Sequence, residues 1–224
     1  MRISAIIVAA GSSRRMGFDK LAADLAGEPV LNRSILAFQS CPEVAEIRVV
    51  TSAEKIDPVT KDAMRLGVTK FVEAVEGGAE RYLSVNAGLS RVREGMDLVA
   101  VHDGARPLVS PEAITQCAKV AMETGAASLA HRVADTLKRA DENQDVSGAV
   151  SREDLWAMET PQIFGVELLR RAYAEVLAKS ELVTDEVSAI EALGEKVRLV
   201  ENREPNLKIT VPGDLGVAEA VMRG

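Results

Sequence analysis

The chain has 224 residues, of which 47% are hydrophobic, so it is long enough for one large core and one or two domains. Its net charge of −7 and its aromatic content of 3% exclude a global basic surface and stacking platforms for nucleic acid, and no apolar run approaches the ~18 residues of a membrane helix. Two cysteines, Cys41 and Cys117, are too few for a disulfide framework. We therefore expect a cytoplasmic protein without nucleic-acid or membrane partners, in which a local cationic pocket holds any anionic ligand.

Apolar, β-branched runs alternate with helical patterns along the chain. Strands are expected at 3–9, 46–51, 68–73, 97–102, 127–133 and 196–201, and helices near 29–40, 55–66, 80–93 and 110–124. Pro29 and Pro111 stand where a first helical turn accepts proline, with Ser110 as an N-cap. The runs at 3–9 and 97–102 are continuously apolar, as in strands buried on both faces. This alternation predicts an α/β fold with three layers around a mostly parallel sheet.

The loop after the first predicted strand carries the strongest signal for a ligand. Ala9, Ala10 and Gly11 lack bulky side chains, so backbone N–H groups there can reach an anion. Two adjacent arginines, the second being Arg15, and then Lys20 supply positive charge within the same loop. The loop lacks both the Gly-Lys-Ser/Thr ending of a Walker A loop and the later glycines of a dinucleotide fingerprint. It favours chemistry on a triphosphate; the alternative is an ordinary Gly-Ser turn with solvated arginines.

Two further motifs follow predicted strands, where ligands bind in open α/β sheets. Gly77 and Gly78 precede a predicted helix, and paired glycines there permit close approach of a flat group such as a base. Asp103 and Gly104 directly follow the fourth predicted strand, and a carboxylate presented at a strand end in this way suits Mg²⁺ or a ribose. Arg106, three residues later, suits a phosphate. The alternative for this second motif is an Asp-Gly turn with a surface arginine.

Residues 134–158 interrupt the alternation of strands and helices. Their middle is polar and turn-rich, and their flanks can pair as a hairpin. A hairpin this charged buries little by itself, so it is either a loose surface excursion or a segment that packs on another subunit. Trp156, at its base, is interpreted as a core anchor.

The C-terminal third holds three more polar motifs, Thr160-Pro161-Gln162, Thr184-Asp185-Glu186 and Asn206-Leu207-Lys208-Ile209-Thr210. Thr184 or Asp185 either binds substrate or caps the helix that runs on to Leu193, and both roles are compatible. Lys208 lies between apolar residues, where a lysine also serves as an edge-strand gatekeeper. No Ser-His-Asp or Cys-His nucleophile set is suggested.

Taken together, these motifs resemble those of the 2-C-methyl-D-erythritol 4-phosphate cytidylyltransferase family. In order, they are Ala-Ala-Gly-x-x-x-Arg-Met…Lys, Gly-Gly-x-Glu-Arg-x-x-Ser-Val, His-Asp-x-Ala-Arg-Pro, Asp-Thr-x-Lys, Arg-x-x-Leu-Trp, Thr-Pro-Gln, Thr-Asp-Glu and Asn-x-Lys-x-Thr. The first motif is common to many sugar-nucleotide transferases, whereas the series is specific. The resemblance covers residues 5 to about 218. It implies a Rossmann-like nucleotidyltransferase fold, one domain over 1–224, with 134–158 as a dimerisation arm.

The resemblance also implies a role for each matching residue on the nucleotide side of the site. The residues of the cytosine and ribose pocket and of the Mg²⁺ site would be Ala9, Ala10, Gly11, Gly77, Gly78, Ser84, Asp103 and Gly104. Arg15 and Lys20 would bind the triphosphate of CTP and stabilise the transition state. Asp103 would lie beside Mg²⁺ and the substrate hydroxyls.

On the acceptor side, the resemblance implies that Arg106, Thr184 and Lys208 hold the sugar phosphate. Thr136 and Arg152, on the arm, would reach the neighbouring subunit's site in a homodimer. The implied reaction joins CTP to 2-C-methyl-D-erythritol 4-phosphate and releases pyrophosphate, with Arg15, Lys20, Arg152 and Lys208 as its catalytic cations.

The chain departs from the family pattern at two places. Lys20 is followed by Leu21-Ala22 where the family has Gln and an aromatic residue, and Ala79 stands where an Asp is usual. These differences concern base selectivity and affinity rather than phosphate chemistry. Another polyol phosphate such as ribitol 5-phosphate is an alternative acceptor, and a non-catalytic nucleotide-binding module is an alternative class. A dinucleotide-dependent redox enzyme is disfavoured by the missing Gly-x-Gly-x-x-Gly.

Overall fold

The computed structural model describes residues 1–11, 17–179 and 183–223. In this part of the chain, the main sheet has the strand order β11-β7-β10-β6-β1-β4-β5. These strands are β1 (Ile3–Val8), β4 (Val44–Thr51), β5 (Phe71–Glu76), β6 (Leu98–Asp103), β7 (Ala126–Arg132), β10 (Trp156–Gly165) and β11 (Arg198–Glu201). β10 is antiparallel to β6 and β7, while the other neighbouring pairs are parallel. The predicted mostly parallel sheet is therefore confirmed.

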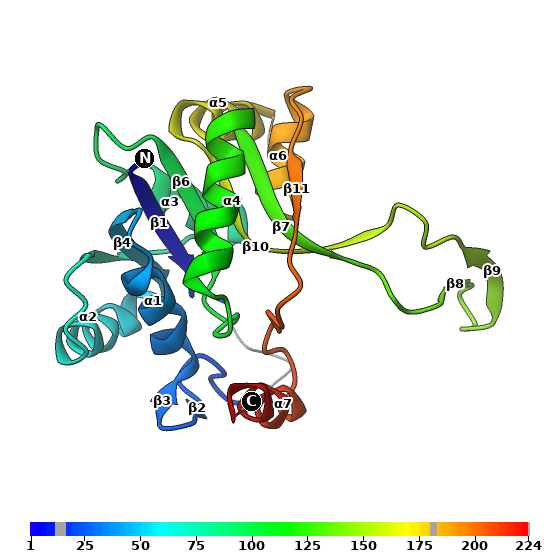
Figure 1. Ribbon diagram of the computed structural model, residues 1–224, viewed down its shortest axis with the longest axis horizontal. Helices are drawn as coiled ribbons and strands as arrows, with labels where there is room; N and C mark the ends of the chain where they lie inside the picture. The colour runs from blue at the N-terminus through cyan, green and yellow to red at the C-terminus, as the bar shows by residue number, and fades with distance from the viewer. Residues whose placement is uncertain (12–16, 180–182, 224) are drawn as a thin grey trace.

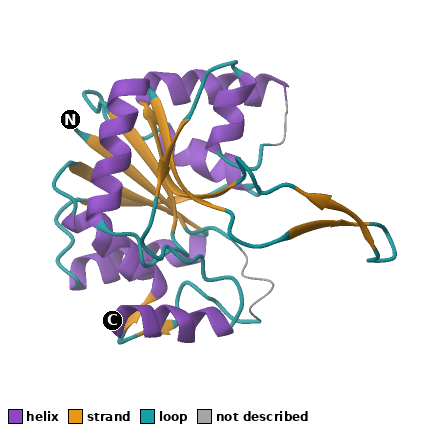
Figure 2. Ribbon diagram, turned by 45° about the vertical axis from the view of Figure 1, so that its right-hand side comes forward, coloured by secondary structure: helices purple, strands orange, loops and turns teal. Residues whose placement is uncertain are grey.

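Helices cover both faces of this sheet (Figures 1 and 2). One hydrophobic core joins it to α1 (Val30–Ser40), α2 (Ile56–Arg65), α4 (Pro111–Thr124) and α7 (Gly213–Arg223). A second core joins the other face to α3 (Arg81–Leu89), α5 (Val166–Lys179) and α6 (Glu186–Ala192). Two cores separated by one sheet give the predicted three-layer fold. A short hairpin of β2 (Asp24–Leu25) and β3 (Glu28–Pro29) and the 3₁₀ turn η1 (Ala53–Lys55) complete the body.

The ends of α4 show how the sequence fixes this architecture locally. The Ser110 side chain accepts a hydrogen bond from the backbone N–H of Ala113 at 3.1 Å, and Pro111 follows at the first helical position. Gly125 ends the helix in the left-handed region, with φ of 86°, which suits a residue without Cβ. The N-cap and the proline position predicted for this helix are confirmed.

β1 and β6 lie side by side at the centre of the sheet. Every residue of β6 is buried, and in β1 only the last is partly exposed, which confirms the prediction from their continuous apolar runs. Their register pairs Val8 with Asp103. Because the strands are parallel, the loops that follow them emerge at the same edge of the sheet.

The structure differs from the predicted elements in three respects. β5 begins at Phe71 rather than near 68, because Gly67 turns the chain with φ of 65°. β10 was not predicted, because a proline such as Pro161 is unusual inside a strand. In the structure, a register shift between Met158 and Gln162 accommodates Pro161. α5 and α7 were also not predicted. Among the described residues, no helix combines the length and apolarity needed to cross a bilayer.

The predicted hairpin is present and projects from the body as an arm (Figure 1). It consists of β8 (Leu137–Ala140) and β9 (Val146–Val150), which pair antiparallel. Trp156 lies at its root, half-buried and outside both cores, with the Arg132 guanidinium 4.5 Å from its ring centroid. The interpretation of Trp156 as a core anchor was therefore wrong, because a cation–π contact at the arm's root holds it instead.

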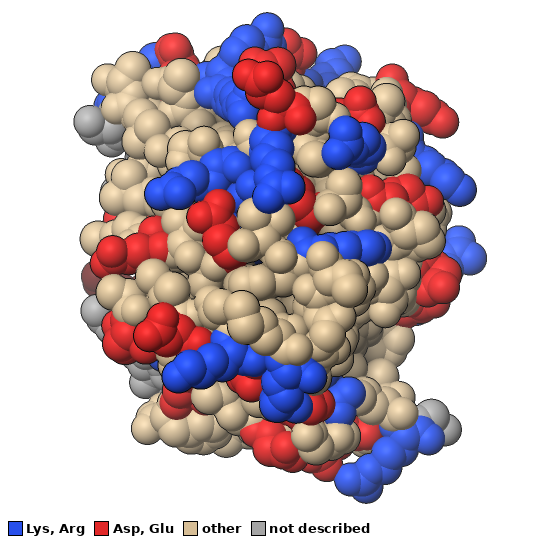
Figure 3. Space-filling view, turned by 90° about the vertical axis from the view of Figure 1, so that its left-hand side faces the viewer, with Lys and Arg blue, Asp and Glu red and all other residues tan. Residues whose placement is uncertain are grey.

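Acidic and basic side chains are interspersed on the face of the body shown in Figure 3. Buried charge on this side of the sheet is paired. Arg48, almost fully buried, contacts the buried carboxylate of Glu46 and lies 3.2 Å from Glu73.

Candidate active site

A cavity of about 350 Å³ opens at the carboxyl ends of β1 and β6, beside the start of α3. The predicted site residues that line it are Ala9, Ala10, Gly11, Lys20, Gly78, Ser84, Asp103 and Lys208. They come from five places in the sequence, and the parallel strands bring them to one edge of the sheet. This is where an open α/β sheet binds its ligand.

Asp103 is the buried carboxylate in the wall of this cavity. Its Oδ2 lies 2.7 Å from Lys208 Nζ, and its Oδ1 lies 3.4 Å from Arg81 Nη2. Burial alone would raise the pKa of the carboxyl group, but these two cations and Arg106 hold it well below its usual range. Asp103 is therefore ionised throughout the neutral pH range.

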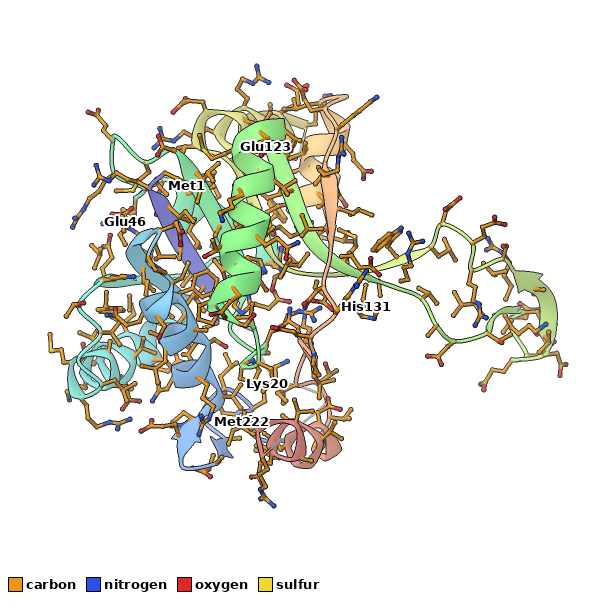
Figure 4. The ribbon with its side chains drawn as sticks, in the orientation of Figure 1. Met1, Lys20, Glu46, Glu123, His131 and Met222 are labelled. Carbon is orange, nitrogen blue, oxygen red and sulfur yellow. The ribbon has the colours of Figure 1, made fainter. Side chains whose placement is uncertain are left out.

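Lys20 and Lys208 reach the cavity from opposite ends of the chain. Lys20 Nζ donates a hydrogen bond of 2.8 Å to the carbonyl oxygen of Ile209, the residue after Lys208. Asp19 holds the chain next to Lys20, since its side chain accepts from the N–H of Leu21 and pairs with Lys55 at 2.8 Å. Figure 4 shows Lys20 at the end of the sheet that faces α7.

The paired glycines are required by packing as well as by ligand access. A Cβ on Gly77 would stand 2.7 Å from Ser84 Oγ and 2.8 Å from Ala10 Cβ. A Cβ on Gly78 would stand 2.4 Å from Leu83 Cβ. Such distances are far inside van der Waals contact, so only glycine lets this turn meet both the first loop and α3. Gly78 lines the cavity, whereas Gly77 does not.

Gly104 and Arg106 support Asp103 from behind the cavity wall. The N–H of Gly104 donates to the carbonyl of Val8 at 2.9 Å, and a Cβ there would stand 2.9 Å from Leu31 Cδ1. Arg106 is largely buried and donates to the carbonyls of Asn206 at 2.7 Å and Met158 at 3.2 Å. Its guanidinium thus ties three segments of the chain together around Asp103.

His102 takes no part in the cavity, but it orders the turn that presents Asp103. The Thr160 hydroxyl accepts from the N–H of Asp103 at 3.0 Å and lies 3.0 Å from His102 Nδ1. His102 Nε2 lies 3.1 Å from the carbonyl of Arg106. A neutral ring with its proton on Nε2 satisfies all these partners. Burial lowers the pKa of His102 to about 4.

This buried histidine predicts a specific loss of stability in acid. Because the folded-state pKa is about 4 against 6.5 for the free side chain, its contribution is complete above pH 6.5 and declines as the pH falls to about 4. The full loss is on the order of 3 kcal/mol. We expect His102→Gln to flatten the pH dependence of the free energy of unfolding over this window, measured by urea denaturation.

The control for this measurement changes an exposed residue that does not titrate. Asn143→Gln, on the arm, should leave the slope between pH 6.5 and 4 as it is in the unmodified protein. An unchanged slope in His102→Gln would show that His102 is not the group responsible.

The remaining predicted site residues lie elsewhere. Arg15 falls outside the described residues. Thr184 is exposed and its Oγ1 lies 3.3 Å from Ser188 Oγ, while Asp185 caps α6 by accepting from the N–H of Ser188. Thr136 and Arg152 are exposed on the arm, where Arg152 donates to the carbonyl of Ala134. None of these described residues lines the cavity of its own chain.

Sequence reasoning missed the residues that support the site from beneath. Arg81 lines the cavity and is held by Glu186. Gln162 accepts from the backbone N–H groups of Glu186 and Val187, and so fixes the start of α6 against β10. All three side chains belong to motifs found in the sequence, but only their contacts in the folded chain show that they support the site.

A three-layer α/β fold with a cation-bearing loop after β1 and a carboxylate at the end of β6 defines a nucleotidyltransferase. The family model for 2-C-methyl-D-erythritol 4-phosphate cytidylyltransferase matches residues 3–224. The chain belongs to this family.

Individual relatives agree with this assignment. The proteins named 2-C-methyl-D-erythritol 4-phosphate cytidylyltransferase from Caldanaerobacter subterraneus and Synechococcus sp. are each 42% identical to it, over 226 and 221 residues. The alignments cover 100% of both chains in the first case, and 97% of this chain and 96% of the relative in the second.

Solved structures give the same result for the fold. The 4-diphosphocytidyl-2C-methyl-D-erythritol synthase of Anaerococcus prevotii superposes with a TM-score of 0.87 at 29% identity, covering 100% of this chain and 96% of that one. The 2-C-methyl-D-erythritol 4-phosphate cytidylyltransferase of Thermus thermophilus superposes with a TM-score of 0.84 at 33% identity, covering 100% of both. The predicted fold class and family are thereby confirmed.

Proposed function

We propose that this chain transfers a cytidylyl group from CTP to 2-C-methyl-D-erythritol 4-phosphate in isoprenoid precursor biosynthesis. The products are 4-diphosphocytidyl-2-C-methyl-D-erythritol and pyrophosphate. The observation that carries the proposal is the convergence of Lys20, Lys208 and Asp103 on one cavity whose other wall is formed by small residues. Family membership supplies the identities of the two substrates.

The chemistry is an in-line displacement at the α-phosphorus of CTP. An oxygen of the acceptor phosphate forms the new P–O bond, and the bond between the α-phosphorus and its bridging oxygen to the β-phosphorus breaks. Pyrophosphate leaves with that electron pair. A phosphate monoester has a second pKa of ~6 and is already ionised near neutral pH, so no general base is required. The neutral, buried His102 agrees with this.

The main obstacle to the reaction is the repulsion between two polyanions. Lys20, together with Arg15 from the first loop, would neutralise the triphosphate and stabilise charge on the α-phosphoryl oxygens. Lys208, fixed 2.7 Å from Asp103, would orient the acceptor phosphate. Thr184 is proposed to bind the same phosphate. Arg106 is proposed to support this phosphate site by holding the segments of Asn206 and Met158 in place. Orientation of this kind lowers the barrier by proximity.

The donor set of the cavity fits a Mg²⁺ ion that arrives with the triphosphate. No cluster of three acidic, histidine or cysteine side chains that could hold a metal occurs among the described residues. Mg²⁺ typically takes one or two carboxylates together with substrate phosphates, and Asp103 is an ionised carboxylate in the cavity wall. Asp103 would hold the ion, which when bound neutralises phosphate charge.

We expect Asp103→Asn to abolish turnover or to weaken its dependence on Mg²⁺, because the amide supplies neither the charge nor the pairing for Lys208. Pyrophosphate release measured over a range of Mg²⁺ concentrations checks this. Asp97→Asn, at the opposite end of β6, is the matched control and should behave like the unmodified enzyme. Full activity in excess chelator would refute the need for a divalent ion.

The arm supports a homodimer in which each active site draws on two chains. It extends from the body and buries few of its own side chains; Val146, for example, is 70% exposed. Thr136 and Arg152 would complete the acceptor site of the partner.

Residues 1–224 are proposed to form one nucleotidyltransferase domain. A cytoplasmic location is also proposed, and the two free, buried cysteines fit it.

The substrate assignment is tested by pyrophosphate release from each nucleoside triphosphate against a panel of polyol phosphates. We expect the highest kcat/KM with CTP and 2-C-methyl-D-erythritol 4-phosphate. A higher kcat/KM with ribitol 5-phosphate would show that this polyol phosphate is the preferred acceptor. Absence of pyrophosphate release from every pair would contradict catalysis.

A further inference from the structure

A buried carboxylate stands directly beneath the active-site cavity. Glu186, the first residue of α6, is 0% exposed. Its Oε1 accepts from Arg81 Nη1 at 2.7 Å and from the Tyr173 hydroxyl at 2.9 Å, and its Oε2 accepts from Arg81 Nη2 at 3.0 Å. Its backbone N–H donates to Gln162 at 3.1 Å. The carboxylate is therefore held from α3 and α5, and the backbone of Glu186 is held from β10.

Arg81 is the link between this carboxylate and the cavity. It opens α3, lines the cavity and has a side chain that is 28% exposed. The same Nη2 that binds Glu186 lies 3.4 Å from Asp103 Oδ1. One guanidinium thus touches two carboxylates, one beneath the cavity and one in its wall. The shorter, two-pronged contact is to Glu186, which is the geometry that guanidinium groups favour.

The pairing determines how strongly Arg81 competes for Asp103. The two-pronged pairing with the Glu186 carboxylate engages both Nη atoms of Arg81, at 2.7 and 3.0 Å. Without the Glu186 charge, Asp103 would be the carboxylate left in contact with Arg81. A partly buried cation such as Arg81 pairs strongly with a nearby carboxylate such as that of Asp103. Asp103 would then be drawn from the acceptor toward Arg81.

We propose that Glu186 is a positioning residue that acts through Arg81: its two-pronged pairing keeps the contact between the guanidinium and Asp103 long, and so leaves Asp103 Oδ1 available to the acceptor. This inference rests on the proposed function, with Asp103 beside the hydroxyls of the acceptor as the family resemblance implies. It assigns the Glu of the Thr-Asp-Glu motif a function in substrate binding from outside the cavity. The structure also predicts an opposite effect on the nucleotide, because removing a negative charge near the cavity favours binding of a triphosphate.

The test is the separate effect of Glu186→Gln on the two substrates. We expect the KM for the acceptor to rise about tenfold, the magnitude that corresponds to losing a charge-assisted contact. The KM for CTP should stay the same or fall, and the Kd for CTP measured by calorimetry without acceptor should do likewise. Glu191→Gln, on an exposed position of the same helix, is the control and should change neither value.

A second variant distinguishes positioning from a structural role. Arg81→Gln alone leaves Glu186 buried without its cation and should lower the melting temperature by on the order of 10 °C. The double variant Arg81→Gln with Glu186→Gln removes both charges, so it should recover most of this melting temperature. It should also return the acceptor KM toward that of the unmodified enzyme, because Arg81 no longer competes for Asp103 Oδ1, while Lys208 keeps its contact with Oδ2.

The outcomes separate this inference from the proposed function. If the unmodified enzyme releases no pyrophosphate, the proposed function fails. If that enzyme is active but Glu186→Gln raises both KM values equally, or lowers only the melting temperature, the positioning role is wrong. An acceptor KM in the double variant as high as in Glu186→Gln would also overturn it, since Arg81 would then not be the intermediary.

Discussion

We expect Lys20→Ala to lower the kcat of cytidylyl transfer by on the order of 10²–10³-fold, the usual effect of removing one preorganised donor from a developing oxyanion. Lys20 is the loop cation that the structure describes at the cavity, and Arg15→Ala should have an effect of the same order. The melting temperature of Lys20→Ala should fall by only a few degrees, because its bond to the Ile209 carbonyl contributes about 1 kcal/mol.

Steady-state pyrophosphate release at saturating substrates and scanning calorimetry measure these two quantities. Lys55→Ala is the matched control, since Lys55 pairs with Asp19 of the same loop but does not line the cavity. It should retain kcat within a few-fold. Normal turnover of Lys20→Ala at saturation would remove this lysine from the mechanism.

Mixing two inactive homodimers restores activity if the arm completes the partner's site. Lys20→Ala and Arg152→Ala should each be nearly inactive alone. In a heterodimer formed by subunit exchange, one site carries both substitutions and the other carries neither. Recovery should therefore approach half of the unmodified activity per heterodimer. The prediction follows from the exposed position of Arg152 on the arm and its absence from the cavity of its own chain.

The control for this experiment uses another exposed arginine of the arm. Arg139→Ala mixed with Lys20→Ala should give the activity expected from unmodified sites alone, because Arg139 is assigned no catalytic part. If Arg152 serves its own chain, each heterodimer site carries one substitution and mixing restores nothing. A fully active monomer would contradict the shared site outright.

The part of the fold that could be predicted from sequence is the part governed by local patterns. Continuous apolar runs predicted β1 and β6, and a proline after a serine N-cap predicted the start of α4. β10 could not be predicted in this way because Pro161 hides it and its partners β6 and β7 are distant in sequence. The buried positions of α5 do repeat at helical spacing, so periodicity is sufficient to find that helix.

The site was predictable where residues follow strands and not where they depend on distant partners. Asp103 and Gly78 stand after strands, and parallel topology brings such positions together. The partner of Arg81 lies 105 residues away in sequence, and no spacing rule connects them. Arg106 has a side chain suited to binding phosphate, yet it donates to the backbone carbonyls of Met158 and Asn206, which lie 52 and 100 residues away in sequence. Such contacts depend on tertiary packing.

The most direct test of the central claim is phosphorus NMR of the product formed from CTP and an acceptor whose three non-ester phosphate oxygens are ¹⁸O. If the acceptor phosphate attacks the α-phosphorus of CTP, the bridging oxygen of the product carries label. Isotope shifts then appear on both of its phosphorus signals, and none on pyrophosphate. An unlabelled bridge, or label in pyrophosphate, would contradict the proposed displacement in this cavity.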